Sequence, residues 1–313
     1  MFPRWWSKKS DGWAAVAIRD SEVAFVHLCR DAHGRPKVQR LGCFRREGND
    51  AEVLSRLRET QSLSQVRVTT LLRMGEYQLL QIEPPKVAPE ELRSAVRWKI
   101  KDLLDFAVDD AVVDILEIPV DRGGVGRAAN VFVVAAPKSV IQRYVQLYQF
   151  AKTPLEVIDV VEAAQRNIAT LYEHDGRSVA LLAFYDQGGL LTFSSAGELL
   201  ATRRIDISLK QLTDADDETR YGLFDRIGLE MQRSLDAFER QFHFVPVDRV
   251  MVSPLPENIS LLAYLSANLY VPVESVVLSD VISSDAAADL STSAAPMRYF
   301  ELCGAALRDE GRA

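Results

Sequence analysis

Apolar-rich runs along the chain follow an order that occurs twice, once in each half. In the first half, three such runs are separated by short turns. A segment with apolar residues three or four positions apart and a further β-branched run come after them. Short apolar runs predict strands, and the wider spacing predicts a helix. The expected elements are strands at 13–18, 23–28, 38–44 and 66–72 and a helix at 50–60.

The second half repeats this order. We expect a meander of three strands, a long helix with one apolar stripe, and then strand, helix, strand and a closing helix. Two copies of a strand–turn–strand opening predict a duplicated, cleft-forming α/β architecture. The expected ranges are 179–184, 190–194, 199–207, 224–242, 247–252, 261–269, 271–277 and 298–307.

A segment of different character lies between the halves. Pro89 and the two acids after it begin a helix in the preferred way. Three strands with two helices on one side predict a small α+β insertion. The expected strands are 76–82, 112–120 and 129–136, the last two joined by the turn 123–126. The inward-facing helix residues are Leu92, Val96, Ile100 and Leu103, then Val140, Ile141, Tyr144, Val145 and Tyr148.

These patterns divide the chain into three parts. The first half begins at residue 1 and ends at 72, and the insertion covers 73–153. The second half, 154–313, includes a closing helix that returns to the first half. Residues 279–296 are rich in Ser, Ala and Asp without periodicity and are predicted to form a mobile loop.

Composition narrows the function classes. The net charge of −7 over 313 residues gives no reason to expect nucleic-acid binding. Three cysteines without a CxxC pair favour a reducing compartment. We expect a cytoplasmic protein, because no apolar run is long enough to span a bilayer and the N-terminus lacks the apolar region of a signal peptide.

The N-terminal residues Phe2, Trp5 and Trp6 are interleaved with cations. Such a segment can rest at a lipid headgroup interface, so peripheral membrane contact is one interpretation. Docking of the tryptophans on the protein core is the other.

No enzyme motif stands out. The four histidines are scattered and have no second ligand at zinc-binding spacing. A nucleophile elbow and a Walker-type loop are both missing from the sequence. We therefore expect no catalytic residues and no metal site.

Four segments in order carry a family resemblance: 94–99 (SAVRWK), 105–110 (DFAVDD), 157–163 (VIDVVEA) and 227–236 (IGLEMQRSLD). Together they make the chain similar to the PilM-type and, more closely, the MshI-type proteins of type IV pilus assembly, within the actin-like ATPase superfamily. The resemblance implies an actin-like (ribonuclease H-like) duplicated two-domain α/β fold, with an α+β (SHS2-like) insertion in the first half.

The nucleotide motifs of that superfamily are altered here. ATP-binding members have Asp-Ile-Gly in the first phosphate turn and a lysine after it. The matching positions hold Ala17 to Arg19, with Ala24 in place of the lysine. The second phosphate turn holds Ala183 to Tyr185, and the adenosine turn begins at Ser253 and contains two prolines.

Each change removes a group that grips Mg-ATP. Alanine cannot anchor hydrated Mg²⁺, and a side chain in place of glycine keeps backbone N–H groups away from phosphate oxygens. Asp186, Gly188 and Gly189 are displaced remnants, and Arg19 is either an anion contact or a solvated turn cation. A degenerate site without a bound cofactor is therefore expected.

The resemblance also implies a function and a partner. It implies a cytoplasmic scaffold, peripheral to the inner membrane, in an MSHA-type pilus platform. It would capture the cytoplasmic N-terminal peptide of a PilN/MshJ-like inner-membrane protein. The groove candidates are Arg73, Tyr77, Arg97 and Lys101. An ATP-binding switch of the platform and a GspL-like type II secretion component are the alternatives.

Overall fold

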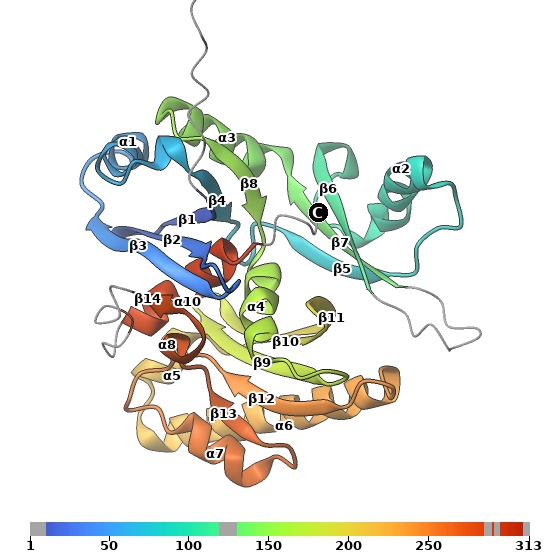
Figure 1. Ribbon diagram of the computed structural model, residues 1–313. Helices are drawn as coiled ribbons and strands as arrows, with labels where there is room; N and C mark the ends of the chain where they lie inside the picture. Colours follow the sequence, from blue (N-terminus) through green and yellow to red (C-terminus); the bar gives the residue numbers. More distant parts are fainter. Residues whose placement is uncertain (1–10, 119–129, 285–289, 291–294, 309–313) are drawn as a thin grey trace, which may run out of the picture. The chain divides into compact units, whose positions relative to one another are not determined.

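The computed structural model describes residues 11–118, 130–284, 290 and 295–308 (Figure 1). It contains two compact units: Met1–Leu71 with Tyr148–Ala313, and Leu72–Leu147. The residues predicted to touch a membrane (Phe2, Trp5 and Trp6) and the turn at 123–126 lie outside the described residues.

The first sheet of the larger unit has the strand order β14-β3-β2-β1-β4-β8. Its antiparallel meander and β4 follow the predicted order. Two strands were not expected: β8, which pairs in parallel with β4, and β14, which pairs in parallel with β3. The bounds are β1 Trp13–Ile18, β2 Glu22–Arg30, β3 Pro36–Arg45, α1 Asp50–Thr60, η1 Leu63–Gln65, β4 Arg67–Leu71 and β8 Leu155–Asp159.

The second sheet has the order β11-β10-β9-β12-β13, which matches β3-β2-β1-β4-β8 strand for strand. This repetition confirms the predicted duplication. The apolar stripe of α6 covers the sheet, and Phe238 stacks on Phe193 with ring centroids 4.4 Å apart. The bounds are β9 Ser178–Tyr185, β10 Gly188–Ser195, β11 Glu198–Ile205, α5 Leu209–Asp214, α6 Asp217–Gln241, β12 Val247–Val252, α7 Leu261–Asn268 and β13 Val273–Ser275.

Two helices join the sheets. α10 (Ala295–Ala306) packs on β1, β2 and β4, and α4 (Val161–Ala169), followed by η4 (Thr170–Tyr172), packs on β9, β10 and β11. The helices also pack on each other, as Figure 1 shows between the blue and the yellow-green sheets. A Cβ at Gly304 would lie 2.2 Å from the carbonyl oxygen of Ala164, so only glycine allows this approach.

The segment predicted as a loop at 279–296 contains regular structure, which corrects that expectation. α8 (Leu278–Val281) leads to β14 (Ser283–Ser284), which pairs in parallel with β3, and α10 begins at Ala295. Ile282 and Leu290 are buried in the core of the larger unit. The few large apolar residues of this stretch (Val281, Ile282 and Leu290) do not repeat at a helix or strand period, so their packing could not be predicted from the sequence.

The smaller unit is a three-stranded antiparallel sheet with α2 packed on it. Val96 and Ile100 are fully buried in its core. Leu103 is 52% exposed, contrary to prediction, because the α-helix ends at Ile100 and a 3-10 turn follows. Val145 is also exposed. The bounds are β5 Gln78–Ile82, α2 Pro89–Ile100, η2 Lys101–Leu103, η3 Val108–Asp110, β6 Ala111–Glu117, β7 Val131–Pro137 and α3 Lys138–Phe150.

Candidate functional site

The two altered phosphate turns occupy equivalent places in the two sheets. One connects β1 to β2 and includes Arg19, and the other connects β9 to β10 and follows Tyr185. Each turn sends a side chain toward one of the two packed helices, Arg19 toward α10 and Tyr185 toward α4. The larger unit thus brings both predicted positions to its two joining helices.

The Arg19 guanidinium is bound on both sides. It donates to Glu22 Oε1 at 2.9 Å, to Glu301 Oε1 at 2.9 Å and to the carbonyl oxygen of Arg298 at 2.7 Å. Arg298 in turn lies 3.3 Å from Glu22 Oε1. We call these four residues the Arg19 cluster. The Arg19 guanidinium is thus paired with two carboxylates of the protein itself, while 31% of its side chain stays exposed.

Backbone geometry at the first turn also differs from a phosphate cradle. A phosphate-binding turn needs N–H groups that are not already bonded. Here the Arg19 N–H donates to the Glu22 carbonyl oxygen at 2.8 Å and closes the hairpin. Ala17, before the turn, has a methyl group and no atom that could bind a metal ion.

The opposite charges of the Arg19 cluster stabilise the ionised forms of its members. Burial alone would lower the pKa of Arg19, but the charges and hydrogen bonds of Glu301 and Glu22 outweigh it and raise that pKa. Partial burial alone would raise the pKa of Glu22. The Cys43 thiol, which donates to Glu22 Oε2 at 3.0 Å, together with Arg19 and Arg298, lowers it instead. Arg19 and Glu22 therefore stay ionised over the ordinary pH range.

Tyr185 fills the corresponding place at the second turn. Its hydroxyl donates to Gln165 Oε1 at 3.2 Å, and Gln165 Nε2 donates to the Leu190 carbonyl oxygen at 3.1 Å. Burial raises the pKa of Tyr185 well above its usual range, and the charges of Glu301 and Glu162 add to the effect. Ala183 is buried at 1% exposure and carries no metal-binding group.

The two glycines after this turn have a packing role. Gly188 has a φ of +143°, and a Cβ there would lie 3.0 Å from the Ile205 carbonyl oxygen. A Cβ at Gly189 would lie 3.0 Å from the Phe184 ring. Asp186 is exposed in the loop between the strands. Ser253 is buried, and its N–H donates to the Leu182 carbonyl oxygen at 2.8 Å.

The residues at these turns do not fit Mg-ATP, since the amides of Arg19 and Ser253 are already hydrogen-bonded and the Tyr185 hydroxyl is bound to Gln165. Within the part of the chain that the structure describes, no group of three or more His, Cys, Asp or Glu side chains could hold a metal ion.

The four peptide-groove candidates have different environments. Arg73 and Lys101 are exposed. Tyr77 is only 2% exposed, so its expected role as a surface contact is wrong. Arg97 donates to the carbonyl oxygens of Val108, at 2.5 Å, and Ala111, at 2.9 Å, and so holds the turn before β6 instead of facing a partner.

Two residues of the smaller unit were missed from the sequence. Trp98 is 77% exposed, and the Lys101 ammonium lies 5.7 Å from its ring centroid. Trp98 is two residues from both Val96 and Ile100, and this spacing could have predicted that it lies away from the buried face of α2. Glu76 accepts hydrogen bonds from the Arg73 N–H at 2.9 Å and from the Tyr144 hydroxyl at 2.8 Å, and no pattern signalled it.

Among the described helices, none combines the length and apolar character that crossing a bilayer requires. No protein-family model and no curated protein matches the chain.

Solved structures do match. A chain of the "PilM-PilN type IV pilus biogenesis complex" is 18% identical, with 96% of this chain and 98% of that chain covered and a TM-score of 0.71. The cytoplasmic domain of EpsL, an inner membrane component of the type II secretion system of Vibrio cholerae, is 15% identical over 79% of this chain and 84% of that chain, with a TM-score of 0.47. A Bacteroides thetaiotaomicron protein with actin-like ATPase fold is 10% identical over 88% and 94%, also with a TM-score of 0.47.

The first of these likenesses extends over nearly the whole of both chains, insertion included. Combined with the duplicated strand order of the two sheets, it confirms the fold class predicted from sequence. The chain has an actin-like α/β fold of the kind seen in the PilM–PilN structure.

Proposed function

We propose that this chain is a cytoplasmic scaffold of a type IV pilus assembly platform, peripheral to the inner membrane, that binds the N-terminal peptide of a PilN-like membrane protein. The observation that carries the proposal is the whole-length likeness to a chain of the PilM–PilN complex. On the sequence resemblance carried by the four segments together, we place the protein in the MSHA type, as an MshI-like chain with an MshJ-like partner.

We further propose that the scaffold works without nucleotide. In an ATP-driven switch, bound Mg-ATP would join the two halves and shift the population of closed molecules. The Arg19 cluster supports a different arrangement, since Arg19 joins the β1–β2 turn to α10 through Glu301. On this proposal the protein is not an enzyme and requires no cofactor.

The surface offered to the peptide is assigned to the exposed residues of the smaller unit. Arg73 and Lys101 supply positive charge, and Trp98 supplies an exposed ring. An extended peptide gains affinity from main-chain hydrogen bonds and specificity from side-chain contacts, to which a tryptophan beside a cation is well suited.

The test is fluorescence anisotropy with a labelled peptide that matches the cytoplasmic N-terminus of the PilN-like protein from the same organism. We expect saturable binding whose Kd is the same with and without Mg-ATP, because a ligand that does not bind cannot couple. Trp98→Ala and Lys101→Glu should each weaken binding about tenfold. Arg226→Glu, on an exposed position of α6, is the matched control.

Failure of the peptide to bind contradicts the scaffold proposal. Micromolar binding of Mg-ATP in isothermal titration, with a change in peptide affinity, favours the ATP-binding switch.

A further inference from the structure

Among the described residues, the outer edge of the first sheet is paired only near the start of β3. β14 pairs with β3 only at Lys37 and Val38. From Gln39 to Arg45, no strand among the described residues lies against the outer side of β3. An edge of this kind presents N–H and C=O groups that can pair with an added strand.

Hydrogen bonds at the end of β3 show which groups face outward. Arg45 lies opposite Glu22 in the β2–β3 ladder. The Glu22 carbonyl oxygen, however, accepts the Arg19 N–H on the β1 side, so Glu22 and Arg45 form a non-hydrogen-bonded pair. The Arg46 N–H donates to Ser21 at 2.9 Å, one position further along. Because bonded and non-bonded pairs alternate in an antiparallel ladder, the N–H and C=O groups of Arg45, Cys43 and Leu41 point outward.

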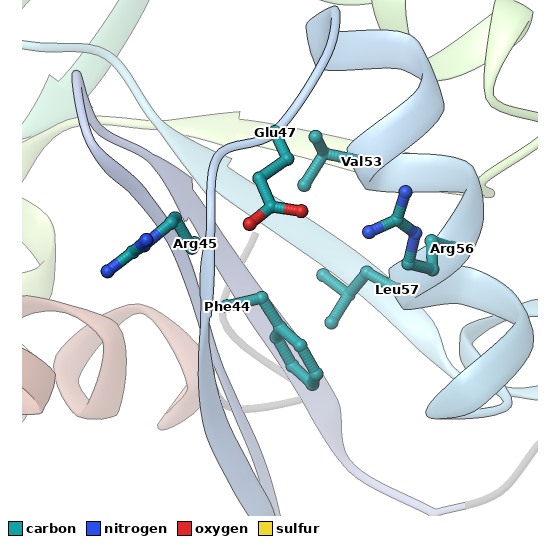
Figure 2. Close-up of a pocket in the computed structure, with 6 residues that line it drawn as sticks. All are labelled: Phe44, Arg45, Glu47, Val53, Arg56 and Leu57. Carbon is teal, nitrogen blue, oxygen red and sulfur yellow. The ribbon is translucent and has the colours of Figure 1, made fainter.

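A pocket lies beside this edge (Figure 2). Its volume is about 140 Å³, and it is lined by Phe44, Arg45, Glu47, Val53, Arg56 and Leu57. Figure 2 shows the β3 strand passing between the Arg45 side chain and the side chains of α1, with the Phe44 ring on the α1 side. An apolar cavity of about 150 Å³ holds a benzene molecule. The pocket, whose lining also includes the charged residues Arg45, Glu47 and Arg56, therefore has the volume for one aliphatic side chain.

The edge is strongly basic in an acidic protein. Between positions 35 and 46 the sequence contains no Asp or Glu and five basic residues, although the net charge of the chain is −7. In the described residues, the guanidinium groups of Arg45 and Arg56 have no hydrogen-bond or ion-pair partner. The five basic residues are Arg35, Lys37, Arg40, Arg45 and Arg46.

We propose that residues 41–45 of β3 receive an extended acidic segment of a partner protein by strand addition, with one apolar side chain in the pocket. Side chains of a strand alternate between its faces, so the recognised pattern is apolar and acidic residues in alternation. The apolar side chain lies against Phe44 and Leu57, and acidic side chains lie beside Arg45. Like charges oppose a second copy of this chain, since two basic edges would face each other.

This surface goes beyond the scaffold function proposed above. All its residues belong to the larger unit, whereas Arg73, Trp98 and Lys101 belong to the smaller one. The two proposals can therefore fail independently.

The probe is a fluorescein-labelled octapeptide of alternating leucine and glutamate with capped ends, and the matching leucine–lysine octapeptide is its control. We compare Arg45→Ala, which removes a charge, with Arg45→Pro, which also removes the outward N–H. Proline is accepted at an edge position whose N–H makes no ladder bond, and its fixed φ is compatible with an extended strand. We expect Arg45→Pro to bind the acidic peptide at least tenfold more weakly than Arg45→Ala, and the lysine peptide to leave all forms unbound.

Amide hydrogen exchange gives a second readout on the unmodified protein. Saturating acidic peptide should slow exchange at Leu41, Cys43 and Arg45 but leave Gly42 and Phe44 unchanged, because those two already bond to β2. Equal affinity of the two Arg45 variants, or unchanged exchange at all five amides, overturns the proposal. In that case, the role of the basic residues is to prevent this edge from pairing with other strands. If light scattering shows a dimer of the unmodified protein and a monomer of Arg45→Pro, the partner at this edge is a second copy of the chain and not an acidic segment.

Discussion

Arg19 and Glu301 are 282 positions apart in sequence, yet the Arg19 guanidinium lies 2.9 Å from the Glu301 carboxylate. The contact ties the β1–β2 turn to the closing helix α10. The turn that would hold a phosphate in an ATP-binding relative therefore contains a cation with its own carboxylate partners. A pair so distant in sequence links the β1–β2 turn to a helix that joins the two sheets.

A double-mutant cycle measures that coupling. Arg19 and Glu301 are partly exposed, at 31% and 21% of their side-chain areas, so we expect a coupling free energy of about 1 kcal/mol. Urea denaturation of Arg19→Ala, Glu301→Ala and the double variant gives the value. The control pair is Arg203 with Glu230, which is longer at 3.4 Å and more exposed, and should couple less. Equal coupling in the two pairs would reject a special role for the Arg19 cluster.

Glu22 should make stability depend on acidity in a defined direction. Its pKa is lowered in the folded state, so its ionised form stabilises the fold above the ordinary glutamate value of about 4.3. That contribution is lost as the pH falls from there through the lower folded pKa. Glu22→Gln should cost about 1–2 kcal/mol at pH 7 and less at pH 3. Unfolding free energies across this range check the sign: a cost that grows on acidification contradicts the assignment.

Gly304 should be intolerant of any side chain. A Cβ at this position would lie 2.2 Å from the carbonyl oxygen of Ala164, so Gly304→Ala must push α10 away from α4 and should destabilise by about 1–3 kcal/mol. The matched control is Gly222→Ala on α6, where no atom lies within 4 Å, and it should stabilise by about 0.4–1 kcal/mol. Thermal denaturation separates the two, and equal shifts of the melting temperature would exclude close packing of the helices as the cause.

The three cysteines should differ in reactivity. Burial raises the pKa of Cys303 to about 12, and burial together with Glu22 raises that of Cys43 to about 11. Thiolate is the reactive form, so Cys29, which is partly exposed, should be alkylated first by iodoacetamide at pH 8. Mass spectrometry of peptides taken over time gives the order. Early labelling of Cys303 would mean that α10 opens from the core far more often than its packing indicates.

Much of the fold could be read from short-range patterns. β1, α1 and β12 have the predicted bounds, because their apolar residues repeat at the period of one element and turn or capping residues flank them. Asn49, for example, accepts the Glu52 N–H in a capping box before α1. The short strand β8 was not recognised, because its five residues are too few to distinguish a strand from a connection.

Only part of the candidate site could be predicted from the sequence. The prediction that Arg19 and Tyr185 replace phosphate-binding residues rests on residue identity at two hairpin turns, which the sequence contains. The partners of these two residues are not visible there. Glu301 and Gln165 are far from those turns along the chain, and their side chains become partners only when α10 and α4 pack between the sheets.

The sequence by itself determined the elements, the duplication and the absence of the usual phosphate-binding groups, because these depend on neighbouring residues and on residue type. Only the tertiary structure decided that Tyr77 is buried, that Arg97 holds backbone carbonyl groups, and that the outer edge of β3 lies unpaired beside a pocket. Burial and pairing belong to surfaces that meet after folding, and the local pattern of a single chain segment does not contain them.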